Sequence, residues 1–445
     1  MPTPHNITFD RTLNAVNDLG WDPTGRTPIN LEPYVQTGTL IEVPPGTYTV
    51  PTSQDVVARK DGISRFGIRG TGADRQDVAF RTAGSGSTYL LWLTGGRDLL
   101  LENYRILYGT RSQPGAIGHV LLPNDGLYVR KLQKNGFTPS TANGDRWFLF
   151  PAIKDAAGTG YIEDIRYWGP AEITGHAASR GFGGAFQNHA GTLYWRNLNI
   201  FNNPGDGAPY VGTHGTNRFE DCLWVNCAMA AARNGGSGSY VRNCRIHIDL
   251  NNQHPQNTGT YEAINGVYWD PQTSEEAGGR IENCTIRIEA PTNPNGAGYS
   301  GSSLPGFGIV IDSSGGDVYV ERNDITVNAD RVPALMAHAP EKRWDRAPAD
   351  VDDWGIVVND NDIRGSATLR EGDGLRRAAI VLERRPGSGV TDVRVDWPQA
   401  AYAVALVPWR DEQTQAIIDD LEYDVRVAPI YDPANNADVG DLTEL

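Results

Sequence analysis

A six-residue pattern repeats along this chain and constrains its fold more than any other feature. The pattern is an apolar residue, a polar residue, Asn or Asp, a variable fourth position, any residue and a second apolar residue. In strict or looser form it occurs as LENYRI (101–106), IEDIRY (162–167), WRNLNI (195–200), FEDCLW (219–224), VRNCRI (241–246), IENCTI (281–286), VERNDI (320–325), VNDNDI (358–363), VTDVRV (390–395) and IDDLEY (418–423). The starts lie 22 to 61 residues apart, so this hexad is constant while the segments between its copies vary.

A short apolar strand precedes most copies of the hexad. These strands are YLLWL (89–93), AMAAA (228–232), GVYW (266–269), GIVI (308–311), AAIVL (378–382) and VALV (404–407). Each repeat therefore predicts a strand, a Gly-rich turn, a second strand, an Asn/Asp corner, a third strand and a long variable loop. Strands this short bury a face only by stacking on the next copy. Because parallel crossovers are right-handed, the expected fold is all-β, a right-handed parallel β-helix of about ten or more coils.

The charge composition excludes some classes of partner. The formal net charge is −15 and the pI is about 5.0, whereas a nucleic-acid-binding protein needs a clustered basic face. No apolar run reaches the roughly 18 residues that membrane insertion requires. Lys occurs only at positions 60, 131, 134, 154 and 342, so Arg dominates the cations. An acidic, Lys-poor chain is typical of proteins made in high salt, and GC-rich coding produces the same bias; both explanations stay open.

The hexad also changes the interpretation of its Cys and Asn residues. Cys222, Cys244 and Cys284 share the fourth position, and without CxxC pairs they predict stacked, buried free thiols rather than zinc ligands or disulfides. Two sequons are present. We expect Asn283 to lie in a corner ladder that no glycan can reach, which leaves Asn6 as the better acceptor.

The repeat resembles the pectate-lyase-like superfamily of right-handed parallel β-helices, which includes polysaccharide lyases, hydrolases and viral tailspikes. In that family an Asn ladder often occupies the corner between the second and third strands. The residues that match it are Asn103, Asn197, Asn243 and Asn283. The segment LGWDPTGRTPINL (19–31) resembles the family's entry segment, but lacks its Gly-Asp-Gly and paired Asp. We expect an N-terminal leader and cap over 1–80, the β-helix over 81–427, and an acidic tail outside the solenoid over 428–445.

The resemblance implies a polysaccharide cleft along the outside of the first strand. The positions just past that strand are His189, His214, Arg233, Asp270, Asp312, and Glu383 with Arg384. A lyase needs a carboxylate cluster, often with Ca²⁺, and an Arg or Lys base, roles that fit Asp270, Asp312 and Arg233. His214 lies in GTHG (212–215), which faintly resembles a motif of polygalacturonase-type hydrolases, although their paired Asp and Arg-Ile-Lys motifs are missing. The alternative is that these are ordinary solvated turn residues. No resident metal or cofactor is predicted, with Ca²⁺ left open.

Tryptophans divide between the core and this expected cleft. Trp195 and Trp224 occupy inward hexad positions. The candidates for stacking on a sugar ring lie at strand ends or in loops on the cleft side: Trp269, Trp344, Trp354 and Trp409. Loop packing explains these four equally well.

Two functions from different classes fit these expectations, and whether the chain is an enzyme stays open. The first is a virion surface protein, such as a tailspike, fibre or capsid decoration, that binds host-surface glycans or glycoproteins. It would act as a homo-oligomer with other virion proteins, at the surface of a virus of a halophilic host. The alternative is a secreted polysaccharide lyase or glycoside hydrolase acting extracellularly on acidic polysaccharide. The N-terminal residues carry no export signal, which favours the virion protein, because virions leave their host by lysis.

Overall fold

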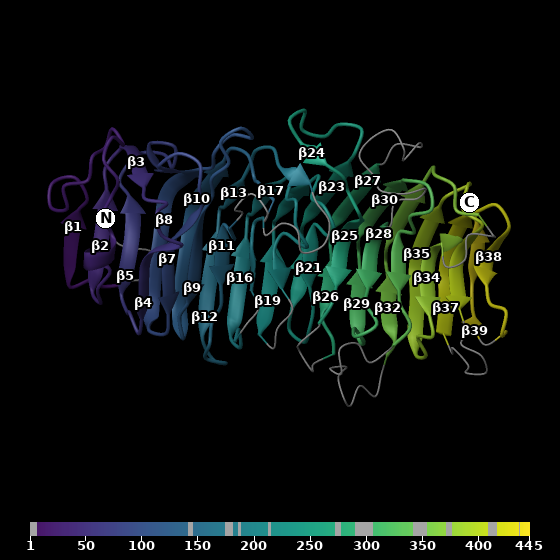
Figure 1. The fold of residues 1–445 in the computed structure, drawn as a ribbon. Helices are drawn as coiled ribbons and strands as arrows, with labels where there is room; N and C mark the ends of the chain where they lie inside the picture. The colour runs from purple at the N-terminus through teal and green to yellow at the C-terminus, as the bar shows by residue number, and fades with distance from the viewer. Residues whose placement is uncertain are drawn as a thin grey trace. The chain divides into compact units, whose positions relative to one another are not determined.

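The computed structural model describes residues 7–140, 146–173, 181–185, 188–211, 215–271, 277–289, 306–340, 354–370, 376–407, 416–435 and 437–445. The chain divides into two compact units, Met1–Pro209 with His254–Gly259, and Tyr210–Gln253 with Thr260–Leu445. Within each unit short strands lie side by side in successive coils (Figure 1). Among the described residues, none forms a helix long and apolar enough to cross a membrane.

Unit 1 contains β1 to β17, β24 and one short 3-10 helix. Their bounds are β1 (Arg11–Asn14), η2 (Glu32–Tyr34), β2 (Thr39–Val43), β3 (Gly46–Val50), β4 (Val56–Asp61), β5 (Phe66–Gly70), β6 (Val78–Thr82), β7 (Thr88–Thr94), β8 (Arg97–Leu107), β9 (Ile117–Leu122), β10 (Asp125–Asn135), β11 (Leu149–Pro151), β12 (Thr159–Glu163), β13 (Arg166–Tyr167), β14 (Glu172–Ile173), β15 (Gly184–Ala185), β16 (Thr192–Arg196), β17 (Asn199–Phe201) and β24 (Thr258–Gly259). The first strands of its coils are β4, β7, β9 and β11, which form one parallel sheet.

Unit 2 repeats the same three-strand coil with greater regularity. Its strands are β18 (Tyr210–Val211), β19 (Thr216–Glu220), β20 (Leu223–Val225), β21 (Ala232–Asn234), β22 (Tyr240–Arg242), β23 (Arg245–Asp249), β25 (Ile264–Trp269), β26 (Arg280–Glu282), β27 (Thr285–Glu289), β28 (Gly306–Ile311), β29 (Val318–Glu321), β30 (Asp324–Asn328), β31 (Leu335–Ala337), β32 (Ile356–Asn359), β33 (Asp362–Gly365), β34 (Ala378–Glu383), β35 (Ser388–Asp396), β36 (Tyr402–Val407), β37 (Ala416–Asp424), β38 (Ala428–Tyr431), β39 (Ala437–Val439) and β40 (Leu442–Glu444). First strands pair with first strands, as in β25 with β28, and second and third strands do likewise.

This parallel, coil-by-coil pairing confirms the predicted fold. The pairs β25–β28, β26–β29 and β27–β30 stack one coil on the next, all in parallel register. The molecule is a right-handed parallel β-helix, because parallel crossovers take that hand. Its inward side chains are those that the hexad predicts, and Trp195 and Trp224 are fully buried among them.

The third hexad position forms the corner by adopting the left-handed backbone conformation. All ten predicted copies have a positive φ there, at Asn103, Asp164, Asn197, Asp221, Asn243, Asn283, Arg322, Asp360, Asp392 and Asp420, with values between 48° and 60°. This conformation costs most residues about 1–2 kcal/mol, and after glycine Asn and Asp tolerate it best. The preference of the hexad for Asn or Asp is therefore a backbone requirement of the turn.

The structure contains one additional copy of the hexad, which lies between the copies that start at Leu101 and Ile162. It is VRKLQK (129–134) within β10, with Lys131 at the corner (φ 53°). Its last position holds Lys134, which is fully buried. The Lys134 ammonium donates to the Gly136 carbonyl at 2.8 Å and lies 4.5 Å from the centre of the Tyr167 ring. These polar partners let a lysine occupy an apolar position, which is why a search for apolar residues misses this copy.

The expected Asn ladder lies one position further along the hexad than predicted. The corner residue Asn283 is exposed, whereas Asn323 and Asn361, at the fourth position, are only 2% exposed. The Asn323 side chain donates to Asn361 Oδ1 at 3.0 Å and accepts the Cys284 backbone N–H at 2.9 Å. The prediction that Asn283 is inaccessible was therefore wrong. Asn6 lies outside the described residues.

The cysteines behave as predicted. Cys222, Cys244 and Cys284 are buried free thiols in the same fourth column, and Cys227 is buried and free as well. Burial raises the pKa of Cys244 well above its ordinary value. Hydrogen bonding to Cys244, together with burial, raises the pKa of Cys284 in the same way.

Both chain ends depart from the predicted division. β1 already pairs with β2, and β2 with β5, so stacking starts at Arg11 and not near residue 81. At the other end β38 pairs with β36, while β39 and β40 pair with β37. The segment 428–445 therefore continues the β-helix by one coil, and its prediction as a tail outside the solenoid was wrong.

Candidate functional site

Three of the predicted catalytic residues do meet in unit 2, at the carboxyl ends of first strands. Arg233 lies in β21, directly beside Tyr210 and Tyr268 in the parallel register. Its guanidinium lies 4.0 Å from the centre of the Tyr210 ring and 5.0 Å from that of Tyr268. The cation is thus stacked between two aromatic rings from neighbouring coils, an arrangement that stabilises a partly desolvated Arg.

Asp270 follows β25 and neutralises this arginine. An Arg233 Nη2 donates to Asp270 Oδ2 at 2.6 Å, and the two side chains are 6% and 0% exposed. The Ser314 hydroxyl lies 3.4 Å from the other carboxylate oxygen. A buried charge pair of this kind is retained only when both ions are mutually compensated and hydrogen-bonded.

Asp312 follows β28 and is engaged in the same way. The Tyr268 hydroxyl donates to its Oδ2, and the Ser313 hydroxyl donates to its Oδ1 at 2.9 Å. Burial, reinforced by the Asp312 and Asp270 carboxylates, raises the pKa of Tyr268 well above its usual range. Tyr268 therefore stays protonated and acts as a donor throughout the physiological range.

Arg385, which the sequence analysis did not identify, connects these turns by hydrogen bonds to their backbone carbonyls. Arg385 is fully buried and donates to backbone carbonyls of three turns, among them His338 O at 2.7 Å and Asp312 O at 2.9 Å. Burial lowers the pKa of Arg385 to about 9. Its position two residues after β34 gives no signal in the sequence, because its partners are carbonyl groups that any residue supplies.

The remaining turn candidates have structural partners or lie outside the described residues. His189 is buried and its Nδ1 accepts the Ile153 backbone N–H at 3.1 Å. Glu383 accepts the Ala339 N–H at 3.2 Å, and the neighbouring His338 lowers its pKa. Arg384 adopts a left-handed corner conformation (φ 48°). His214 belongs to the undescribed segment 212–214.

The tryptophan predictions are corrected in the same region. Trp269 is fully buried and offers no ring face to a sugar. Trp354 is partly buried, and its carbonyl accepts a hydrogen bond from Arg385 at 3.3 Å. Trp344 and Trp409 lie outside the described residues. Trp269 is therefore not a platform for a sugar ring.

The outer face of the first-strand sheet in unit 2 is not a polar cleft. Next to the inward residues Ile309 and Ile311, Val310 points to the opposite face, and it is fully buried, as are its register partners Met336 and Val381. These side chains form one apolar cluster with Ala405 and Tyr402. An acidic polysaccharide would find no exposed charge along this column.

Metal chemistry at these turns also lacks ligands. Within the described part of the chain, no three His, Cys, Asp or Glu side chains are grouped so that they could hold a metal ion. Asp270 and Asp312 direct oxygens toward Arg233, Tyr268 and serine hydroxyls instead. The carboxylate pair thus does not fit the Ca²⁺ cluster that lyase chemistry would need.

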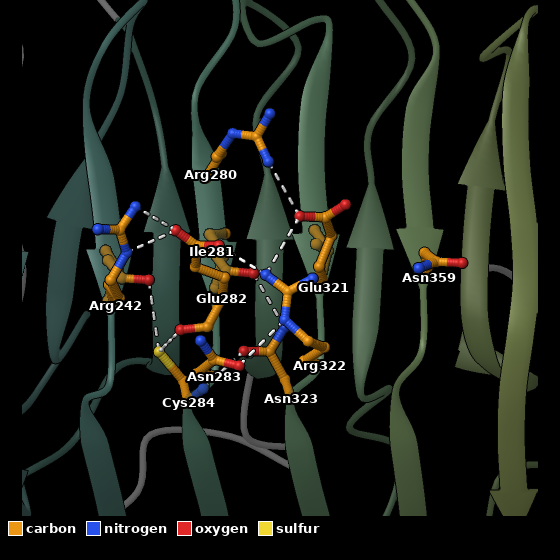
Figure 2. A network of polar contacts seen from close by, with 12 residues as sticks. Arg242, Arg280, Ile281, Glu282, Asn283, Cys284, Glu321, Arg322, Asn323 and Asn359 are labelled. Carbon is orange, nitrogen blue, oxygen red and sulfur yellow. Dashed lines mark hydrogen bonds and ion pairs between the residues drawn. The ribbon is translucent and has the colours of Figure 1, made fainter.

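The outer face of the second strands carries charges that are paired with one another. Glu282 accepts from Arg242 at 2.6 Å and from Arg322 at 2.8 Å, while Arg280 pairs with Glu321 at 3.1 Å (Figure 2). In unit 1 the corresponding pair is Arg130 with Glu102, at 2.8 Å. These arginines are neutralised within the surface, which leaves little net charge for a ligand.

Tyrosines also line up on this second-strand face of unit 1. Tyr128, Tyr161 and Tyr194 are register partners, with ring centres 5.9 and 5.0 Å apart and ring planes within 8° of parallel. They occupy the position before the hexad, a signal that the sequence contained. Because each ring covers its neighbour's face, the ladder presents ring edges, whereas a sugar ring needs an exposed face.

Comparisons with known proteins agree with the β-helix fold but do not identify a function. No family model and no curated protein matches this chain. Solved structures with a similar arrangement include a mannuronan C-5 epimerase A-module from Azotobacter vinelandii (TM-score 0.47, 11% identity, covering 97% of this chain and 99% of that one). Another is the surface protein and adhesin PfbA of Streptococcus pneumoniae (TM-score 0.43, 10% identity, covering 97% of this chain and 100% of that one). A third is ORF18 of Geobacillus virus E2 (TM-score 0.37, 13% identity, covering 97% of this chain and 61% of that one). These likenesses concern the fold alone, and a fold does not determine a function.

Proposed function

We propose that this protein is a β-helix of a virion surface that binds host-surface glycans or glycoproteins and does not cleave them. One observation carries the choice of a binding protein over an enzyme: the Arg233–Asp270 pair is buried, at 6% and 0% exposure. A general base must come within hydrogen-bonding distance of the proton that it removes. Arg233 instead lies between two tyrosine rings and against a carboxylate, where a polymer has no access to it.

The last coil supports association with other protein surfaces. The exposed large apolar residues of the described chain are Ile417, Val427, Val439, Leu442 and Leu445, at 38% to 56% exposure. All lie in or next to β37, β38, β39 and β40, and among the described strands β38, β39 and β40 are paired on one side only. Exposed apolar edge strands are an association hazard unless another surface covers them. We propose that further copies of this chain, together with other virion proteins, cover this end.

The charge composition supports a host that lives in high salt. Acidic residues number 54 against 39 Lys and Arg. At low ionic strength, self-repulsion of such a surface weakens the compact state, and salt screens it. We expect the midpoint of thermal unfolding to rise on going from 0.1 M to 2 M KCl. A midpoint that falls or stays constant would contradict a halophilic origin.

A depolymerisation assay tests the choice between binder and enzyme. Purified protein is incubated with polygalacturonate, alginate and neutral dextran, and both new unsaturated ends and new reducing ends are measured. We expect neither product. If cleavage occurs, the proposal fails, and loss of the cleavage in a folded Asp270→Asn protein would assign the activity to the first-strand turns.

The assembly state tests the virion part of the proposal. Native mass spectrometry and light scattering should find a symmetric oligomer, and Leu442→Asp should shift it towards monomer. The matched control is Thr443→Asp, which adds the same charge to the same strand, β40. A monomer at all concentrations would contradict an oligomeric virion component.

A further inference from the structure

A groove in unit 1 lies away from the first-strand turns, along the carboxyl ends of the third strands. It consists of two adjoining hollows of about 510 and 750 Å³ that share Gly109 and Thr110. The first hollow reaches from Arg26 to Arg81 and Tyr108, and the second from Arg111 to Phe137 and Gln256. We call this pair of hollows the arginine groove.

Of the described residues that line the two hollows, none carries a carboxylate and three are arginines. Arg26, Arg81 and Arg111 are exposed, and no ion pair within 4.0 Å is found for them among the described residues. Other arginines of unit 1, such as Arg65, Arg69 and Arg75, each pair with an aspartate or glutamate. In a chain of net charge −15, this concentration of uncompensated cations creates a local field of opposite sign.

Asp22, four residues before Arg26, is hydrogen-bonded within the turn that carries this arginine. The carboxylate of Asp22 accepts the backbone N–H groups of Thr24 and Arg26, at 2.9 Å each, and the Thr24 hydroxyl at 2.7 Å. These hydrogen bonds lower the pKa of Asp22 and hold it in the turn. Asp22 therefore orients the loop without neutralising the Arg26 side chain.

The Arg81 guanidinium makes two hydrogen bonds within the protein and has further N–H donors that could bind a ligand. It lies in β6, where its Nη2 donates to Gly25 O at 3.3 Å and its Nε lies 3.4 Å from Thr49 Oγ1. Both contacts are long, and among the described residues the remaining guanidinium N–H groups have no hydrogen-bond partner. A planar guanidinium in this state matches a carboxylate or sulfate in bidentate geometry.

The floor of the groove is bare backbone with aromatic and hydroxyl groups around it. A Cβ on Gly109 would lie 2.0 Å from Gln113 O, and one on Gly136 would lie 2.3 Å from Tyr108 O, so neither position admits a side chain. Phe137 and Tyr108 line the hollows but are only 4% and 5% exposed, whereas Thr110 and Ser112 supply hydroxyls 3.1 Å apart. Hydroxyl groups and cations together are suited to binding an acidic sugar chain.

We propose that the arginine groove binds an anionic glycan, with its carboxylate or sulfate groups on Arg81 and Arg111 and its hydroxyl groups beside Thr110 and Ser112. This inference rests on the proposed binding function in one respect, namely that the ligand is a glycan polymer. It names a site on the third-strand side of unit 1, remote in the coil from the first-strand turns. Arg81 and Arg111 line adjoining hollows, so the expected ligand is one with repeated negative charges that engages both arginines at once.

Equilibrium binding to defined polymers tests the proposal. Polygalacturonate supplies carboxylates, dextran sulfate supplies sulfates and dextran supplies neither. Binding is measured by isothermal titration calorimetry in about 0.15 M NaCl. At this salt concentration the interactions between exposed charges are screened beyond about 8 Å. We expect at least one anionic polymer to bind and dextran not to bind. The polymer that binds decides between carboxylate and sulfate recognition.

Single charge-removing variants locate the site. Arg81→Gln and Arg111→Gln should each weaken binding about tenfold or more, as expected for lost charge-assisted hydrogen bonds. Arg97→Gln is the matched control, since Arg97 is exposed at the start of β8 and lies outside both hollows. Absence of binding to both anionic polymers, or equal loss in Arg97→Gln, overturns the inference.

Failure of this inference is distinguishable from failure of the proposed function. If the Arg81→Gln and Arg111→Gln proteins still bind host cells as the unmodified protein does, the arginine groove is not the site, while the binding function stands. If the unmodified protein cleaves polysaccharide, the proposed function fails whatever these variants show.

Discussion

The guanidinium of Arg233 lies 2.6 Å from the carboxylate of Asp270, and both side chains are almost completely buried. The same two residue types in an open cleft would be a base and a charge stabiliser. Burial and mutual neutralisation make them a structural pair that ties the turn after β25 to β21. Their role is therefore tested by stability rather than by activity.

Replacing Asp270 by Asn should be strongly destabilising. The variant keeps the shape but leaves the Arg233 charge buried without its counter-ion, which costs about 3 to 5 kcal/mol. Chemical unfolding measures the change as a lower midpoint. Asp438→Asn, the same change at an exposed position, serves as the control and should have almost no effect. Equal stability of the two variants would contradict the structural role.

Replacing the corner residue Asn243 tests the backbone account of the hexad. Asn243 is exposed and has a φ of 54°. Val should lower the free energy of unfolding by about 1–2 kcal/mol, because a β-branched residue resists the left-handed conformation. Gly should be tolerated within about 0.5 kcal/mol, since it adopts that conformation freely. Equal costs for the two variants would show that side-chain contacts, not backbone geometry, select Asn.

Replacing Asn323 tests the fourth-position ladder. Asn323→Leu removes the acceptor for the Cys284 N–H and the donor for the Ile281 carbonyl, which lies 3.0 Å away. Leaving buried backbone groups unsatisfied costs about 1–3 kcal/mol each. Asn359→Leu is the control on the outer face, where Asn359 is only partly buried. Thermal unfolding of both proteins should give the lower midpoint for Asn323→Leu, and the reverse order would contradict the ladder.

Thiol chemistry tests the column of cysteines. All four cysteines are buried, and the pKa values of Cys244 and Cys284 are raised. Because the thiolate is the reactive form, an aromatic disulfide reagent should label none of them in the native protein within minutes. In guanidinium chloride all four should react. Rapid labelling of a native cysteine would contradict the packing described.

Acidification should weaken unit 1 through His119. This residue is fully buried, its Nδ1 donates to the Phe148 carbonyl at 3.2 Å, and its Nε2 accepts from the Tyr104 hydroxyl at 3.0 Å. Burial lowers the pKa of His119 to about 4, below the ordinary histidine value of 6.5. The unfolded state therefore binds the proton more readily between these values, and stability falls as the pH falls from about 6.5 towards 4.

The variant His119→Gln checks this pH dependence. It retains a donor and an acceptor but does not titrate, so its unfolding midpoint should decline less between pH 7 and pH 5 than that of the unmodified protein. The two proteins are compared by urea unfolding at matched ionic strength. Parallel declines would assign the acid sensitivity to other groups.

The sequence by itself determined the coil. Apolar residues at the first and last hexad positions require burial, and Asn or Asp at the third position matches a left-handed corner, so the periodic signal specifies the fold without knowledge of any contact. The hexad copy that ends at Lys134 was not predicted, because its last position is charged instead of apolar. The Gly136 carbonyl, the Thr138 hydroxyl and the Tyr167 ring accommodate this charge, and the hydrophobic pattern of the sequence does not reveal these contacts.

Only the tertiary structure decided which polar residues are available to a ligand. Arg233 and Arg81 are indistinguishable by residue type and both lie in strands. Register places Arg233 between two tyrosines and near Asp270, whereas it places Arg81 beside Thr49 at the edge of a groove without carboxylates. Charge compensation depends on neighbours from coils dozens of residues away, and hydrophobic periodicity carries no information about them.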